Sequence, residues 1–174
     1  MTLLNAELHI NVSILKENIC YLKTKIDKKS NFLAVVKANA YGHSLKKFVE
    51  KLDDCVDGYA LVRLDEALQV RDLSKKPILL MQGIYDDDEA LIAKRNGFMC
   101  VLHTQEQIRT YSRNLENKNI WLKVNTGMNR LGFSENVLTD LNLLNIKPSV
   151  LMSHLASSDD LYLSLIHISS PRDP

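Results

Sequence analysis

The sequence predicts a parallel α/β fold. Short β-branched runs alternate with amphipathic helical patterns, and one strand–helix unit recurs about every 20–30 residues, the length of a βαβ crossover. This rhythm is typical of a parallel sheet covered by helices. No G-x-G-x-x-G sequence follows a strand, which weighs against a Rossmann cofactor site. The periodicity alone leaves open whether the sheet is doubly wound or curled into a barrel.

Strands are predicted at short apolar or β-branched runs, at residues 7–10, 32–36, 59–62, 77–81, 98–102, 120–124 and 150–152. Helices are predicted where apolar residues recur at helical spacing, at residues 13–26, 44–52, 64–73, 86–94, 105–115 and 134–144. The uninterrupted apolar run at 32–36 favours a strand buried on both faces. Asn11 or Ser13 is the candidate N-cap of the first helix.

Composition and charge exclude several classes of partner. The chain has 174 residues with 22 basic and 21 acidic side chains, so it lacks the basic excess that nucleic acids or acidic membranes would require. No run approaches the ~20 apolar residues of a membrane span, and the N-terminus does not read as a signal peptide. We therefore expect a cytoplasmic protein. The absence of a C-x-x-C pair predicts no metal site.

Reactive side chains follow the predicted strands, and in parallel α/β folds ligands bind at the carboxyl ends of strands. Lys37 is the most informative of them, because it directly follows an apolar run. Burial there would lower the pKa of its amine, which favours condensation with an aldehyde. Position alone favours a lysine that extends from the strand end to solvent.

Three segments resemble the signatures of alanine racemases and occur in the same order as in that family. They are AVVKANAYGH at residues 34–43, WLKVNTGMNRLGF at 121–133 and SHLASSD at 153–159. The resemblance covers roughly residues 3–160 and implies an incomplete (β/α)8 TIM-type barrel of about six parallel strands. Residues 161–174 depart from the family and look more like translated vector sequence, so we expect a disordered tail there.

The resemblance implies pyridoxal 5'-phosphate as cofactor and assigns roles around it. Lys37 would hold the cofactor as an internal aldimine and then serve as a catalytic base at the substrate α-carbon. Tyr41 would donate its hydroxyl to the cofactor phosphate, and His154 would lie near the cofactor ring. An ordinary half-buried tyrosine is the alternative for Tyr41, and from position alone a core histidine fits His154 equally well.

The second signature carries further implied roles. Arg130 would contact the phenolic oxygen of the cofactor and the substrate carboxylate, and Met128 would approach the substrate across a dimer interface. Lys123 matches a lysine that is carbamylated in many members of the family. Two residues depart from the pattern: Ser44 stands where glycine is frequent, and Asn125 replaces a common aspartate.

The function implied is the interconversion of L-alanine and D-alanine, supplying D-alanine for peptidoglycan, by a homodimer in the full-length family. Serine is an alternative substrate. The family takes its second base from a C-terminal β domain that this sequence lacks, so we expect the chain to be inactive alone, or to bind the cofactor weakly or not at all. Related barrels with the same cofactor, such as decarboxylases, share a lysine at the first strand end but lack the paired signatures.

Overall fold

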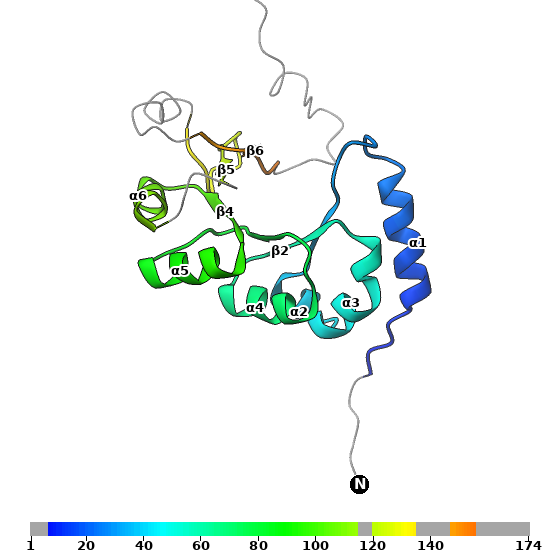
Figure 1. The fold of residues 1–174 in the computed structure, drawn as a ribbon. Helices are drawn as coiled ribbons and strands as arrows, with labels where there is room; N and C mark the ends of the chain where they lie inside the picture. The colour runs from blue at the N-terminus through cyan, green and yellow to red at the C-terminus, as the bar shows by residue number, and fades with distance from the viewer. Residues whose placement is uncertain (1–6, 115–119, 135–146, 156–174) are drawn as a thin grey trace, which may run out of the picture.

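The computed structural model describes residues 7–114, 120–134 and 147–155. Six parallel strands form one curled sheet in sequence order, which makes half of a barrel (Figure 1). The strands are β1 (Leu33–Val35), β2 (Gly58–Leu61), β3 (Ile78–Leu80), β4 (Met99–Leu102), β5 (Ile120–Lys123) and β6 (Val150–Met152). The incomplete parallel barrel predicted from the sequence is therefore confirmed.

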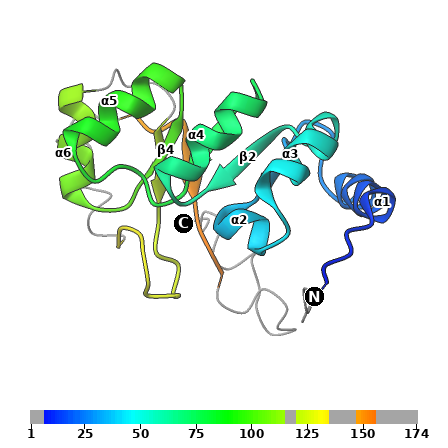
Figure 2. The same cartoon turned by 90° about the horizontal axis from the view of Figure 1, so that it is seen from below.

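Helix α1 (Val12–Lys23) precedes β1, and the helices that follow connect successive strands. They are α3 (Leu45–Leu52), α4 (Leu64–Leu73), α5 (Asp87–Asn96) and α6 (Gln105–Asn114), with a 3-10 turn η1 (Asp53–Cys55) after α3. Helices α3 to α6 lie side by side along one face of the sheet (Figures 1 and 2). Asn11 caps α1 by accepting the Ile14 N–H at 3.1 Å. None of the described helices is long and apolar enough to cross a bilayer.

The strands alternate between two apolar layers, because successive side chains point to opposite faces of a sheet. The larger layer packs between the sheet and the helices and includes Tyr59, Leu61, Leu80 and Leu122. A smaller layer on the concave face contains Ala60, Leu79 and Val101, with Trp121 and Met152 packed against it. Lys123 lies two residues after Trp121, so the strand period directs its side chain to the concave face.

Two details of the predicted strands are wrong. Residues 7–10 form no strand, and their side chains are exposed or half-buried. The run at 32–36 is not buried on both faces, because Val35 is 43 % exposed. Among the described residues β1 pairs with β2 alone and is an edge strand, so its concave side lacks the cover that a central strand receives.

Some predictions fall on residues that the structure does not describe. The helix at 134–144 lies almost wholly outside them, as do the boundary at residue 160 and the tail at 161–174. Within the described ranges, the observed helix and strand ends differ from the predicted ones by a few residues at most.

Candidate active site

Lys37 opens a left-handed turn directly after β1. This turn, α2 (Lys37–Tyr41), has φ between 51° and 55° at Ala38, Asn39 and Ala40, and Tyr41 continues it with φ 53°. A left-handed backbone costs non-glycine residues roughly 1–2 kcal/mol each, so four in succession mark a strained segment. Gly42 then ends the turn at φ 83° without that cost.

The strained turn brings the two residues of the first signature together. Lys37 is half-buried, and its Nζ lies 5.8 Å from the centroid of the Tyr41 ring. This is within the range of a cation–π contact. Tyr41 itself is 58 % exposed, so its hydroxyl is accessible to a ligand at the strand end.

Two neighbouring helices hold the turn through Asn39, which the sequence analysis gave no role. The Asn39 N–H donates to Glu66 Oε1 on α4 at 2.8 Å. Its side-chain Oδ1 accepts the N–H of Leu45, the first residue of α3, at 2.8 Å. Ser44 caps α3 by accepting the Lys47 N–H at 3.4 Å, and its φ of 69° is a backbone conformation that favours glycine.

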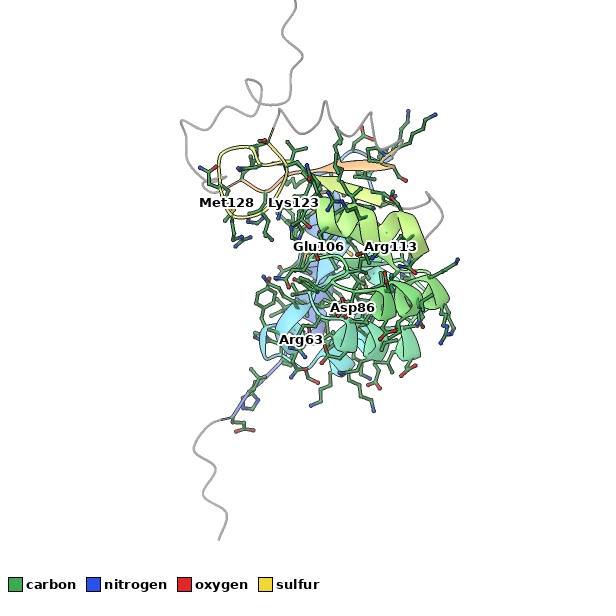
Figure 3. All side chains as sticks on the ribbon, turned by 90° about the vertical axis from the view of Figure 1, so that its left-hand side faces the viewer. Arg63, Asp86, Glu106, Arg113, Lys123 and Met128 are labelled. Carbon is green, nitrogen blue, oxygen red and sulfur yellow. The ribbon has the colours of Figure 1, made fainter. Side chains whose placement is uncertain are left out.

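The second signature forms a loop that folds back on β5. Asn125 Oδ1 accepts the N–H groups of Gly127 and Asn129 at 3.1 and 3.0 Å, and Asn125 Nδ2 donates to Asn129 Oδ1 at 2.9 Å. An aspartate could accept the same two N–H groups, but it could keep the third bond only if the Asn129 amide turned over to donate from its Nδ2. Asn125 therefore shapes the loop that carries Met128 and Arg130. Figure 3 labels Met128 on this loop, near Lys123.

Lys123 is the buried cation of this region, with only 6 % of its surface exposed. Burial, and secondarily the positive charge of Arg130, lower the pKa of the Lys123 amine. Among the described residues no carboxylate forms an ion pair with it. A cation in this position is costly, so the site favours an uncharged or modified amine.

The loop after β5 also reaches the end of β6. Thr126 Oγ1 shares a short hydrogen bond with Ser153 Oγ, the residue before His154. This bond places His154 near the second signature. The His154 side chain itself is exposed. Arg130, in the loop after β5, and His154, two residues after β6, thus follow neighbouring strands of the sheet.

A polar cluster that joins the ends of β3 and β4 to α6 was missed by the sequence analysis. Gln107 Nε2 donates to the carbonyl of Gln82 at 2.6 Å, and its Oε1 accepts the His103 N–H at 3.0 Å. His103 Nε2 donates to the same carbonyl at 3.2 Å, while its buried Nδ1 has no hydrogen-bond partner among the described residues. Burial lowers the His103 pKa, which favours the neutral ring.

The predicted site residues thus fall into two groups on one rim. Lys37 and Tyr41 lie at the end of β1, whereas Lys123, Met128, Arg130 and His154 lie at the ends of β5 and β6. A pocket of about 400 Å³ opens beside the second group, between His103, Asn125 and Arg130. No hydrogen bond or ion pair between described residues joins the two groups, which lie toward opposite edges of the sheet.

Comparison with known proteins identifies the family. The protein-family model described as "Alanine racemase, N-terminal domain" matches residues 10–165, which are most of the chain. The chain belongs to the alanine racemase N-terminal domain family. The alanine racemase of Mannheimia succiniciproducens is 40 % identical to it in an alignment of 163 positions that covers 89 % of this chain and 45 % of that protein. The chain thus spans less than half the length of this relative.

Solved alanine racemase structures share the half-barrel. The biosynthetic enzyme from Pseudomonas aeruginosa superposes with a TM-score of 0.72 at 34 % identity, covering 81 % of this chain and 42 % of that one. The enzyme from Bartonella henselae gives a TM-score of 0.76 at 25 % identity, with 89 % and 46 % covered, and that structure contains covalently bound pyridoxal phosphate.

Proposed function

We propose that this chain is the cofactor-binding part of a racemase that uses pyridoxal 5'-phosphate to interconvert L-alanine and D-alanine. One observation carries the proposal: a strained turn at the end of β1 sets the Lys37 amine beside the Tyr41 ring. The family supports the substrate, because curated relatives at 40 % and 36 % identity are named alanine racemases. Alanine is thus favoured over serine.

The residues present fit this cofactor chemically. A primary amine at Lys37 suits an aldehyde, and the accessible Tyr41 hydroxyl is a donor suited to a phosphate. Arg130 offers a planar guanidinium to a phenolate or carboxylate oxygen. The strained backbone that presents Lys37 also favours a binding site over a packing role, because strained conformations cluster at functional sites.

Each of the predicted site residues would have a separate role in binding or proton transfer. Bound pyridoxal phosphate supplies an electron sink for negative charge at the substrate α-carbon. Lys37 would bind the cofactor aldehyde and, once displaced by substrate, move a proton at the α-carbon. Tyr41 would orient the phosphate, and Arg130 with Met128 would position the substrate. His154 would lie near the cofactor ring.

Other statements about the whole protein remain predictions. These are the homodimer, the cytoplasmic location, the supply of D-alanine for peptidoglycan and the inactivity of the isolated chain. Inactivity is expected because racemisation needs an acid or base on each face of the α-carbon, and the described residues supply only Lys37 with a proposed proton-transfer role.

Two measurements on the 174-residue chain test the proposal. Incubation with pyridoxal phosphate, borohydride reduction and peptide mapping should place one covalent pyridoxyl group on Lys37. Conversion of L-alanine is then measured by chiral chromatography, with L-serine as the comparison substrate. Capture on Lys37 without turnover would agree with a partial site, whereas capture on another lysine or none would contradict the proposed function.

Lys123 carries a separate prediction, a carbamate formed from carbon dioxide. An uncharged amine attacks carbon dioxide and loses a proton, and the lowered pKa of Lys123 makes that form more available at neutral pH. The resulting carbamate anion could pair with Arg130, whose positive charge repels the unmodified, protonated Lys123 amine. Carbon-13 NMR with labelled bicarbonate should show a carbamate signal that Lys123→Arg removes and Lys94→Arg, on the exposed face of α5, retains. Loss of the signal in both variants would contradict the assignment.

A further inference from the structure

The turn that presents Lys37 is not held by its own hydrogen bonds alone. Within it, the Ala40 N–H donates to the Val36 carbonyl at 3.0 Å and the Gly42 N–H donates to the Ala38 carbonyl at 2.9 Å. The N–H of Asn39 instead leaves the turn and donates to a side chain of another helix. A left-handed run of this length therefore depends on what surrounds it.

That external acceptor is Glu66, in the first turn of α4. Its Oε1 accepts the Asn39 N–H at 2.8 Å, and a hydrogen bond to a charged acceptor is among the stronger kinds in proteins. Its Oε2 is buried with no hydrogen-bond partner among the described residues, which costs free energy. A carboxylate kept there despite that cost indicates a role that a simpler side chain would not fill.

The hydrogen bond between Asn39 and Glu66 joins residues that are 27 positions apart in the sequence. Glu66 follows β2 and Asn39 follows β1, and these strands are neighbours in parallel register, so the loops after them meet at one rim. The Asn39 side chain meanwhile binds the start of α3 through Leu45. The turn is thus clamped between α3 and α4, two residues after Lys37.

We infer that Glu66 is a positioning residue for the cofactor lysine: it holds the left-handed turn in the conformation that sets the Lys37 amine beside Tyr41. This role rests on the proposed function, because it concerns the amine that would capture pyridoxal phosphate. Glu66 need not touch the cofactor. Glu66 would instead set the fraction of cofactor-free chains in which the turn is correctly formed. The apparent affinity for pyridoxal phosphate falls in proportion to that fraction.

Two substitutions separate this role from general stability. Glu66→Met keeps the aliphatic stem but has no oxygen acceptor, whereas Glu66→Gln retains an amide oxygen for the Asn39 N–H. Glu89→Met is a matched control, because Glu89 Oε2 accepts the Tyr85 N–H at 2.9 Å in the equivalent first turn of α5. Each variant is made in the 174-residue chain and its folding is checked by thermal unfolding.

The first readout is amide hydrogen exchange at Asn39 without cofactor. Exchange should be at least about tenfold faster in Glu66→Met than in the wild type, near wild-type in Glu66→Gln and unchanged in Glu89→Met. The second is the pyridoxal phosphate concentration that gives half-maximal capture on Lys37 after borohydride reduction. It should rise about tenfold in Glu66→Met alone if the competent turn is populated one-tenth as often.

Equal exchange and equal capture in Glu66→Met and the wild type would overturn the inference. If Glu66→Met does not fold, the Asn39 amide decides: protection in both the wild type and Glu66→Gln supports the role, and its absence in either overturns it. A wild type that captures no pyridoxal phosphate would defeat the proposed function and, with it, the role toward the cofactor. Exchange at Asn39 would then still report whether Glu66 holds the turn, so the two failures are distinguishable.

Discussion

Replacing Lys37 by alanine is expected to reduce covalent capture of pyridoxal phosphate to background. Any racemisation that the chain supports should fall at least about a thousandfold, because the amine is proposed both to bind the aldehyde and to move a proton. Nothing else on the turn after β1 can substitute, since Tyr41 offers only a hydroxyl there. Capture is measured by mass spectrometry of the reduced peptide.

Two further variants show whether charge or nucleophilicity is lost. Lys37→Arg keeps a cation that can attract the phosphate but is not deprotonated in proteins, so it should also fail to capture the aldehyde. Lys47→Ala removes an exposed lysine from the adjacent helix α3 and should behave as wild type. Undiminished capture in Lys37→Ala would remove the basis of the proposed function.

Replacing Gly83 by alanine is expected to cause a large loss of stability. Gly83 has φ 74°, and a Cβ atom there would lie 2.3 Å from the Val101 carbonyl oxygen and 2.9 Å from Gln107 Nε2. The first contact is with backbone, so it cannot be relieved by a rotamer change. Left-handed strain and overpacking together should lower the free energy of unfolding by about 2–5 kcal/mol.

Gly97 provides the matched control for that prediction. It also has positive φ, 65°, and ends α5, but a Cβ atom there would meet nothing within 4 Å. Gly97→Ala should therefore carry only the conformational cost, roughly 1–2 kcal/mol. Urea unfolding of both variants measures the difference, and equal losses would show that the contact with β4 is not the cause.

The sequence predicted most of the fold because its elements are short and strongly patterned. Helix α4 at Leu64–Leu73 and strand β6 at Val150–Met152 have the predicted bounds. The strand predicted at residues 7–10 was wrong, because alternation over a few residues does not reveal whether a partner strand exists. Burial of Val35 was overestimated for a related reason: an apolar run does not show which strand lies at the edge.

The candidate site was predicted unevenly. The sequence proposes six residues that lie in contiguous segments resembling family signatures or that directly follow strands: Lys37, Tyr41, Lys123, Met128, Arg130 and His154. Glu66, Gln107 and Asn39 were missed, because their significance lies in hydrogen bonds to residues in other loops. Glu66 is 27 positions from its partner, and no local pattern marks that distance.

By itself, the sequence determined the order of strands and helices, the family and the residue types available for chemistry at the strand ends. These follow from periodicity and contiguous motifs, which are properties of neighbouring residues. Only the tertiary structure decided that residues 38–41 turn left-handed, that Lys123 is buried beside another cation and that Glu66 reaches Asn39. Each of these depends on packing between segments distant in the chain, where sterics and desolvation act on atoms that the sequence does not place together.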